Sequence, residues 1–121
     1  DCTLSDNTTI TGGKIPPSTF IAPRSFLIIT SNTYKNLYKT YGNTVAVSGF
    51  PTFNDSGDLI LIKDPDGNEI DKINFSSDWY KDPVKKNGGW TLERIIPEKD
   101  CGKDNWIASQ DPGGGTPARR N

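Results

Sequence analysis

The residues that could carry chemistry in this chain are its carboxylates, its two cysteines and one loop that combines aromatic with basic side chains. The 15 acidic residues could in principle supply a carboxylate pair for hydrolysis. Most of the Asp residues lie in turn-like stretches, where the side chain bonds its own backbone. Histidine is absent, so neither a Ser-His-Asp or Cys-His site nor a His-ligated zinc site can form. We therefore expect no catalytic residue, no cofactor and no enzyme activity.

The one stretch that looks like a metal site is the acidic turn at residues 64–68. Asp64, Asp66 and Asn68 alternate there as they do in the first half of a calcium loop. The glycine, Gly67, comes two places too early for that loop, and Phe75 stands where a bidentate Glu is needed. A metal-free type I turn closed by a glycine bulge is the favoured interpretation, and no metal ligand is predicted.

The two cysteines, Cys2 and Cys101, lie far apart in the sequence and form no CxxC motif. They could be two unrelated buried thiols. The composition, rich in Asn, Thr, Ser and Gly, is common in exported modules and favours a disulfide instead. Such a bond would close a long loop and stabilise the fold.

A possible ligand-contact loop follows residue 76. It carries two aromatic and three basic side chains: Trp79, Tyr80, Lys81, Lys85 and Lys86. Aromatic plus basic side chains can contact sugars, nucleic-acid backbones or acidic proteins. The alternative, which we favour, is that Trp79 folds inward to close one end of the domain while the lysines keep the loop soluble.

Charge and hydropathy exclude two kinds of partner. The net charge is −1, so no global field attracts nucleic acid, and nucleic-acid binding is not expected. The longest apolar run, residues 26–29, is far too short to span a bilayer. Methionine is absent, so we expect a processed product or a piece of a longer protein.

Most of the chain is predicted to be β-structure. Ile and Val far outnumber Leu, and this bias favours strands over helices. The clearest hairpin joins residues 58–63 to 69–75, with a bulge at Asp71 and Lys72, where the alternation breaks. The apolar run that starts at Phe26 is expected to be covered on both faces. The remaining strands are predicted at residues 3–6, 26–30, 90–95 and 104–108.

One helix is predicted, and it is marked by an aromatic stripe. Tyr34, Leu37, Tyr38 and Tyr41 recur at helical spacing on one face. Ser31 or Asn32 could cap its start, and Gly42 is placed to end it in a left-handed conformation. The stripe could form a stacking platform for bases or sugars, but packing onto the sheet is favoured.

Two large side chains are expected in the core, and two charged neighbours on a strand each need a partner of their own. Trp90 and Trp106 are expected to anchor the core. Glu93 and Arg94 are neighbours on a strand, so they point to opposite faces and cannot pair with each other. Arg94 is expected to be buried and satisfied by carbonyls.

Five motifs, in order, resemble the lamin tail domain of exported bacterial proteins. Two looser matches, residues 15–17 and 26–30, extend the resemblance over nearly the whole chain. The five motifs are residues 53–61, 64–71, 88–94, 104–106 and 114–117.

The resemblance, like the short strands with regular turn signals, implies an immunoglobulin-like β-sandwich, which we place at residues 1–112. The glycines and prolines of residues 113–121 predict an exposed tail after it. It also implies a non-catalytic structural or binding module of a larger exported protein, secreted or at the bacterial cell surface, with protein or surface partners. The alternative is an accessory targeting or substrate-contact domain of a secreted hydrolase, such as a nuclease or phosphoesterase.

The chain departs from the family pattern at its N-terminal end, and this departure leads to a prediction about the sheet edge. The family's first two strands are missing here, because the sequence begins where the next strand is expected. We expect an open sheet edge at residues 3–6 or 26–30, covered by a homodimer through strand pairing or by a rearranged loop.

Overall fold

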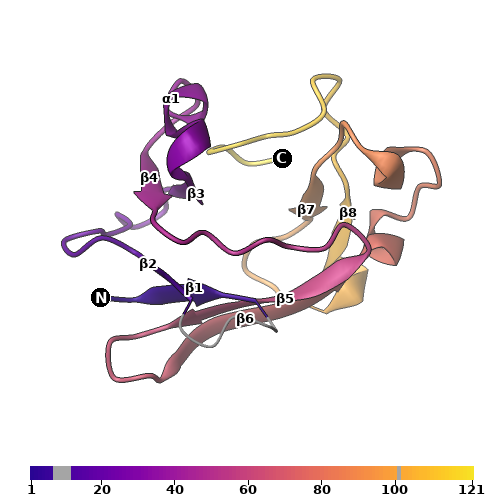
Figure 1. Cartoon of the computed structure of the whole chain (residues 1–121). Coiled ribbons are helices and arrows are strands. Elements are labelled where there is room, and N and C mark those ends of the chain that lie inside the picture. The colour runs from indigo at the N-terminus through magenta and orange to yellow at the C-terminus, as the bar shows by residue number, and fades with distance from the viewer. Residues whose placement is uncertain (7–11, 101) are drawn as a thin grey trace.

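The computed structural model describes residues 1–6, 12–100 and 102–121, and it is mostly β-structure arranged in several small sheets. A four-stranded antiparallel sheet lies along one side, with β3, β4 and the helix above one end and β7 and β8 above the other (Figure 1). The strands are β1 (Thr3–Ser5), β2 (Gly13–Lys14), β3 (Ile28–Ser31), β4 (Thr44–Val47), β5 (Gly57–Lys63), β6 (Glu69–Ser76), β7 (Leu92–Arg94) and β8 (Trp106–Ala108). The helical turns are η1 (Asn32–Tyr34), α1 (Lys35–Tyr38), η2 (Ser77–Tyr80), η3 (Lys85–Asn87) and η4 (Lys103–Asn105).

The four-stranded sheet has the order β2-β1-β5-β6. The expectation that residues 3–6 form an open edge is wrong, because β1 pairs with β2 on one side and with β5 on the other. Leu4 of β1 is buried. The short strand β2 pairs with the edge of β1 that was predicted to be open. On the second candidate edge, β3 pairs with β4 in parallel.

The β5–β6 hairpin confirms the clearest prediction from the sequence. Its bulge lies one residue earlier than expected, at Ile70, since Ile62 pairs with Asp71 and Lys63 with Glu69. Ile70 is exposed. Strand β6 is an edge of its sheet, and the side chains of Glu69 and Lys72 form an ion pair there. Charges and a bulge on an edge strand discourage the addition of another strand.

The turn between these strands is organised by Asp64. Its Oδ1 atom accepts hydrogen bonds from the backbone N–H groups of Asp66 and Asn68, at 2.9 and 2.8 Å. Its Oδ2 atom accepts another from the Asn68 side-chain amide. Gly67 adopts a φ of 88°, which a residue with a side chain rarely adopts. The carboxylate that resembled a calcium ligand is therefore occupied by the turn itself.

The predicted helix is shorter than expected, and although it lies beside β3 and β4, its side chains are not buried. Only residues 35–38 are α-helical, preceded by η1, and no side chain of either is buried. The prediction that the aromatic stripe packs onto the sheet is wrong. Ser31 is the N-cap but makes no side-chain cap bond, and Gly42 has no positive φ. The strand after residue 25 begins at Ile28 and is not covered on both faces, and Phe26 stays exposed.

The C-terminal segment, residues 113–121, is not an exposed tail throughout. Gly114 is buried and residues 115–118 are half-buried. Its backbone joins the β7 side of the molecule, because the Thr91 N–H donates to the Gly114 carbonyl at 2.8 Å. The Asn121 side chain donates to the Arg94 carbonyl at 2.8 Å. In Figure 1 the yellow trace of this segment runs between α1 and β7.

The buried apolar core of the described residues is small. It consists of Leu4, Ile15, Val47 and Ala108. The two predicted anchors, Trp90 and Trp106, are half-buried. The Arg94 side chain donates from Nη2 to the Lys99 carbonyl, but its buried Nε has no acceptor among the residues described. The predicted hydrogen bonding of Arg94 to carbonyls is therefore only partly confirmed.

The predicted disulfide remains a prediction. Cys2 is half-buried just before β1, and Cys101 lies outside the described residues. We expect protein isolated under oxidising conditions to be lighter by two hydrogen atoms than the reduced protein, as measured by intact-mass spectrometry. Two thiols that react with an alkylating agent without prior reduction would contradict this prediction.

Candidate functional site

The predicted ligand-contact loop lies against β8 and the residues around it. The Trp79 and Trp106 rings lie 6.2 Å apart, centroid to centroid, tilted by 37°. The Tyr80 hydroxyl donates to the Trp90 carbonyl at 3.2 Å. Burial, with a smaller contribution from the Asp55 carboxylate, raises the pKa of Tyr80. Both aromatic side chains are half-buried and contact other parts of the chain.

Two of the three lysines in this loop also bind the protein itself. The Lys81 ammonium donates to the carbonyls of Lys103 and Trp106, at 3.1 and 2.8 Å. The Lys85 ammonium donates to the Ser109 carbonyl at 2.8 Å and lies 4.1 Å from the centre of the Trp90 ring. Lys86 is exposed. These contacts hold the loop against β8 and the residues beside it. Ligand contact through the loop stays a prediction.

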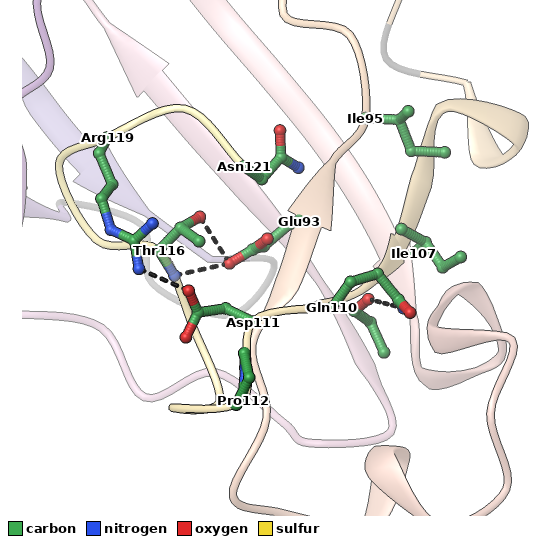
Figure 2. A pocket seen from close by; sticks show the side chains of 10 residues that line it. Glu93, Ile95, Ile107, Gln110, Asp111, Pro112, Thr116, Arg119 and Asn121 are labelled. Atoms are coloured by element: carbon green, nitrogen blue, oxygen red, sulfur yellow. Dashed lines mark hydrogen bonds and ion pairs between the residues drawn. The ribbon is translucent and has the colours of Figure 1, made fainter.

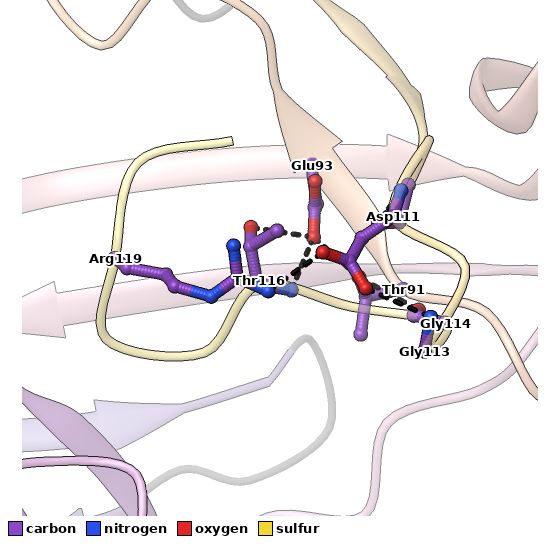
Figure 3. A network of polar contacts seen from close by, with 8 residues as sticks. Thr91, Glu93, Asp111, Gly113, Gly114, Thr116 and Arg119 are labelled. Carbon is purple, nitrogen blue, oxygen red and sulfur yellow. Dashed lines mark hydrogen bonds and ion pairs between the residues drawn. The ribbon is translucent and has the colours of Figure 1, made fainter.

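The most elaborate polar cluster is centred on the Glu93 carboxylate (Figure 3). Its Oε1 atom accepts hydrogen bonds from the Thr91 hydroxyl at 2.9 Å and from the backbone N–H and hydroxyl of Thr116, both at 2.8 Å. Burial raises the pKa of Glu93, but these bonds, together with one from Ser109, outweigh it and leave the pKa below its ordinary value. A carboxylate that is ionised and surrounded by donors cannot act as a general acid.

The other carboxylates of this region are engaged in the same way. The Asp111 Oδ1 atom accepts from the Gly113 N–H, and its Oδ2 atom lies 2.7 Å from the Arg119 guanidinium. These bonds, with the Arg119 side chain contributing most, lower the pKa of Asp111. The Arg120 guanidinium pairs with Glu98 and is the main cause of the lowered pKa of Glu98. These groups hold the C-terminal segment in place.

Gly114 is needed for this arrangement. Its φ is 92°, and a Cβ atom added there would lie 2.4 Å from the Gly89 carbonyl oxygen. The backbone of the C-terminal segment therefore approaches the 88–90 turn more closely than a side chain would permit.

At least three hollows border the C-terminal segment, and one, of about 440 Å³, has Tyr38, Tyr41 and Asp111 among its lining residues. Two others border the same segment. The first, of about 460 Å³, is shown in Figure 2, where the Glu93 and Asp111 carboxylates point toward Thr116 and Arg119 and the side chains of Ile95 and Ile107 lie on the far side. The second, of about 400 Å³, lies between α1 and β7 and has Phe26 and Tyr38 among its lining residues, with Arg94 and Arg120. Volumes of this size fall within the range of pockets that bind small molecules.

An aromatic stripe over η1, α1 and the turn that follows is exposed, and we call it the α1 face: Tyr34, Leu37, Tyr38 and Tyr41. The exposed fractions of these four side chains, in order, are 55%, 58%, 36% and 57%. The Tyr38 and Tyr41 rings lie 6.3 Å apart. Tyr38 also lines the 400 Å³ hollow, so the α1 face borders this hollow.

Two further searches of the described residues found nothing. No group of three or more His, Cys, Asp or Glu side chains could hold a metal ion, and no helix in these ranges is long and apolar enough to cross a membrane. Comparison with known protein families, with curated proteins and with solved structures finds no match for this chain.

The structure does not decide whether the predicted loop or the α1 face contacts a ligand. The structure places Trp79, Tyr80, Lys81 and Lys85 against the protein and leaves the α1 face open. The helical spacing of the four residues identified the α1 face in the sequence. Their exposure was not expected, because amphipathic helices normally bury such a stripe.

Proposed function

We propose that this chain is a non-catalytic binding module of a larger exported bacterial protein, and that it binds a partner through the α1 face. The observation that carries the proposal is the exposure of all four residues of that face, which spans η1, α1 and the turn after them, and neither helix has a buried side chain. Soluble proteins rarely expose a contiguous apolar patch without a partner for it.

The fold we propose is an immunoglobulin-like β-sandwich of the lamin tail type. Two of the family-like motifs, residues 88–94 and 114–117, lie far apart in the sequence and are joined by the bonds of Glu93 and Thr91. Antiparallel pairing dominates the main sheet, as it does in such sandwiches. Export and display at the cell surface follow from the same resemblance.

The proposal is tested by sedimenting the purified chain with washed bacterial cells. We expect the wild-type protein to sediment with the cells, and the variant Leu37→Ala/Tyr41→Ala to do so several-fold less. Both of these side chains are more than half exposed, so their removal leaves the fold intact.

A matched control removes two apolar side chains of similar or greater exposure elsewhere, in the variant Ile70→Ala/Val84→Ala. We expect this control to bind as the wild type does. A wild-type chain that stays in the supernatant, or equal losses in the two variants, would refute binding through the α1 face.

A further inference from the structure

Three segments that lie apart in the sequence line a further hollow, of about 490 Å³. They are the turn before β5, the end of β6 with η2, and the η3 loop up to Trp90. This hollow is larger than each of the three that border the C-terminal segment. Its volume is within the range of pockets that bind small molecules. Among the described residues, none of those that line it belongs to the α1 face.

The half-buried part of this hollow is aromatic. The Phe53 ring makes an edge-to-face contact with the Phe50 ring, and the two centroids lie 5.9 Å apart. The Tyr80 ring is fixed by the hydrogen bond from its hydroxyl to the Trp90 carbonyl. Aromatic rings held in this way offer apolar surfaces on which the C–H face of a ligand ring can pack. Four half-buried aromatic side chains line the hollow: Phe53, Phe75, Tyr80 and Trp90.

The exposed rim of the hollow is polar and carries one charge of each sign. The Asp55 carboxylate and the Lys86 ammonium form no ion pair or hydrogen bond with any described residue. The raised pKa of Tyr80, caused mainly by burial and less by Asp55, places this carboxylate near the phenol. Four exposed side chains form the rim: Asn54, Asp55, Lys86 and Asn87.

Hydrogen bonds hold both loops of the rim in place. The backbone N–H and the side-chain amide of Asn54 both donate to the Asp58 carboxylate, each at 3.1 Å. In the other loop, the Asp82 carboxylate accepts from the N–H groups of Val84 and Lys85, at 2.8 and 2.9 Å. A rim that is already ordered loses little further conformational freedom when a ligand binds.

The two rim amides keep an acceptor for a ligand. The Asn87 amide donates to the Pro83 carbonyl at 2.9 Å, as the Asn54 amide does to Asp58. Neither side-chain oxygen accepts a hydrogen bond from a described residue. The rim therefore offers acceptors at Asn54, Asp55 and Asn87 and a donor at Lys86.

These groups favour one class of ligand. An ion of either sign would be attracted by one of Asp55 and Lys86 and repelled by the other. A purely apolar ligand would cover the rim groups without bonding them, which costs free energy. A sugar hydroxyl both donates and accepts, so it can bond the carboxylate, the ammonium or an amide oxygen. The C–H face of the same sugar ring can pack on the aromatic side chains.

We propose that this hollow binds one neutral sugar unit of a glycan. The sugar ring packs against the aromatic side chains, and its hydroxyls bond Asp55, Lys86 and the amide oxygens of Asn54 and Asn87. Two of the five residues of the predicted ligand-contact loop, Tyr80 and Lys86, thus contact the ligand. The site is separate from the α1 face and does not rest on the proposed function.

The test is native gel electrophoresis of the full chain through gels that each contain one soluble neutral polysaccharide: dextran, a β-glucan, a mannan or a galactan. A protein that binds the polymer migrates more slowly than it does in a gel without polymer. We expect at least one of the four polymers to slow the chain. Dextran sulfate, which is anionic, should slow it no more than dextran does.

A charge-balanced variant locates the contact. Asp55→Ala/Lys86→Ala removes one charge of each sign, so migration without polymer is unchanged, and both side chains are exposed, so the fold is kept. We expect the dissociation constant for the polysaccharide to rise about tenfold, because hydrogen bonds to charged groups are the stronger ones. The control Asp66→Ala/Lys39→Ala removes the same pair of exposed groups outside the hollow and should bind as the wild type does.

Each other outcome would overturn the proposal. Migration that none of the four neutral polymers slows would do so, and so would equal losses in the two variants. Stronger binding to dextran sulfate than to dextran would replace the neutral sugar by an anion. A higher melting temperature with millimolar free tryptophan, and no binding to any polymer, would replace it by a zwitterionic aromatic ligand. Loss of polysaccharide binding in Leu37→Ala/Tyr41→Ala would place the sugar on the α1 face instead.

Discussion

Replacing Trp79 by Ala is expected to lower the free energy of unfolding by about 3 kcal/mol. The Trp79 ring is half-buried and stacks near the Trp106 ring, in a loop whose lysines are bonded to the carbonyls of Lys103, Trp106 and Ser109. Removing the indole leaves a cavity beside β8 and weakens the contact that holds the loop there. Urea unfolding followed by circular dichroism measures the change.

The matching control for this substitution is Val84→Ala. Val84 lies in the same loop with 75% of its side chain exposed, so its truncation should change stability by less than about 0.5 kcal/mol. A Trp79→Ala protein as stable as the wild type would return Trp79 to the list of ligand-binding candidates, since the indole would then have no structural role.

Replacing Glu93 by Ala is expected to cost about 2–3 kcal/mol, because hydrogen bonds to a charged group are the stronger ones and their donors would be left half-buried without an acceptor. The Thr116 N–H and the hydroxyls of Thr91 and Thr116 lose their common partner. Amide exchange at Thr116 should accelerate, while exchange in the β5–β6 hairpin should change little. Glu69→Ala, which removes only an exposed ion pair, should cost less than about 1 kcal/mol.

The pH dependence of the Glu93 contribution has a definite sign. Its pKa in the folded protein lies below the ordinary value of 4.5, so the folded state favours the ionised form. The stabilisation is therefore complete above about pH 5 and is lost as the pH falls through the folded pKa. The conservative variant Glu93→Gln should differ from the wild type near neutral pH and converge with it at low pH. A difference that stays constant with pH would contradict the role of the charge.

The sequence was most informative where neighbouring residues decide the structure. The β5–β6 hairpin was predictable because its strands are the longest of those described, lie close in sequence and are joined by a turn whose Asp and Gly have specific roles. The bulge was misplaced by one residue, since alternation does not reveal which residue the partner strand skips. Strand β1 was located correctly, but its second neighbour, β2, is only two residues long and has no apolar pattern of its own.

The sequence was least informative where distant segments meet. Helical spacing identified the α1 face but not whether anything covers it, because covering depends on tertiary contacts. The C-terminal segment was read as an exposed tail from its glycines and prolines. Those same residues permit its close approach to the 88–90 turn, and Thr116 supplies the donors for Glu93. No local pattern shows that a threonine will bond a glutamate on a distant strand.

The contacts of the C-terminal segment also set the order in which the chain can mature during synthesis. Residues 113–121 leave the ribosome after every segment that they bind. A Cβ atom built on Gly42 would lie 2.6 Å from that of Ala118, so this segment also reaches the turn that follows α1. The β1, β5 and β6 strands can pair while the chain is still growing, but β7 and the α1 region are joined only after these last residues emerge. A released chain that ended at residue 112 would therefore keep the paired main sheet but lack the contacts of residues 113–121 with β7 and with the turn after α1.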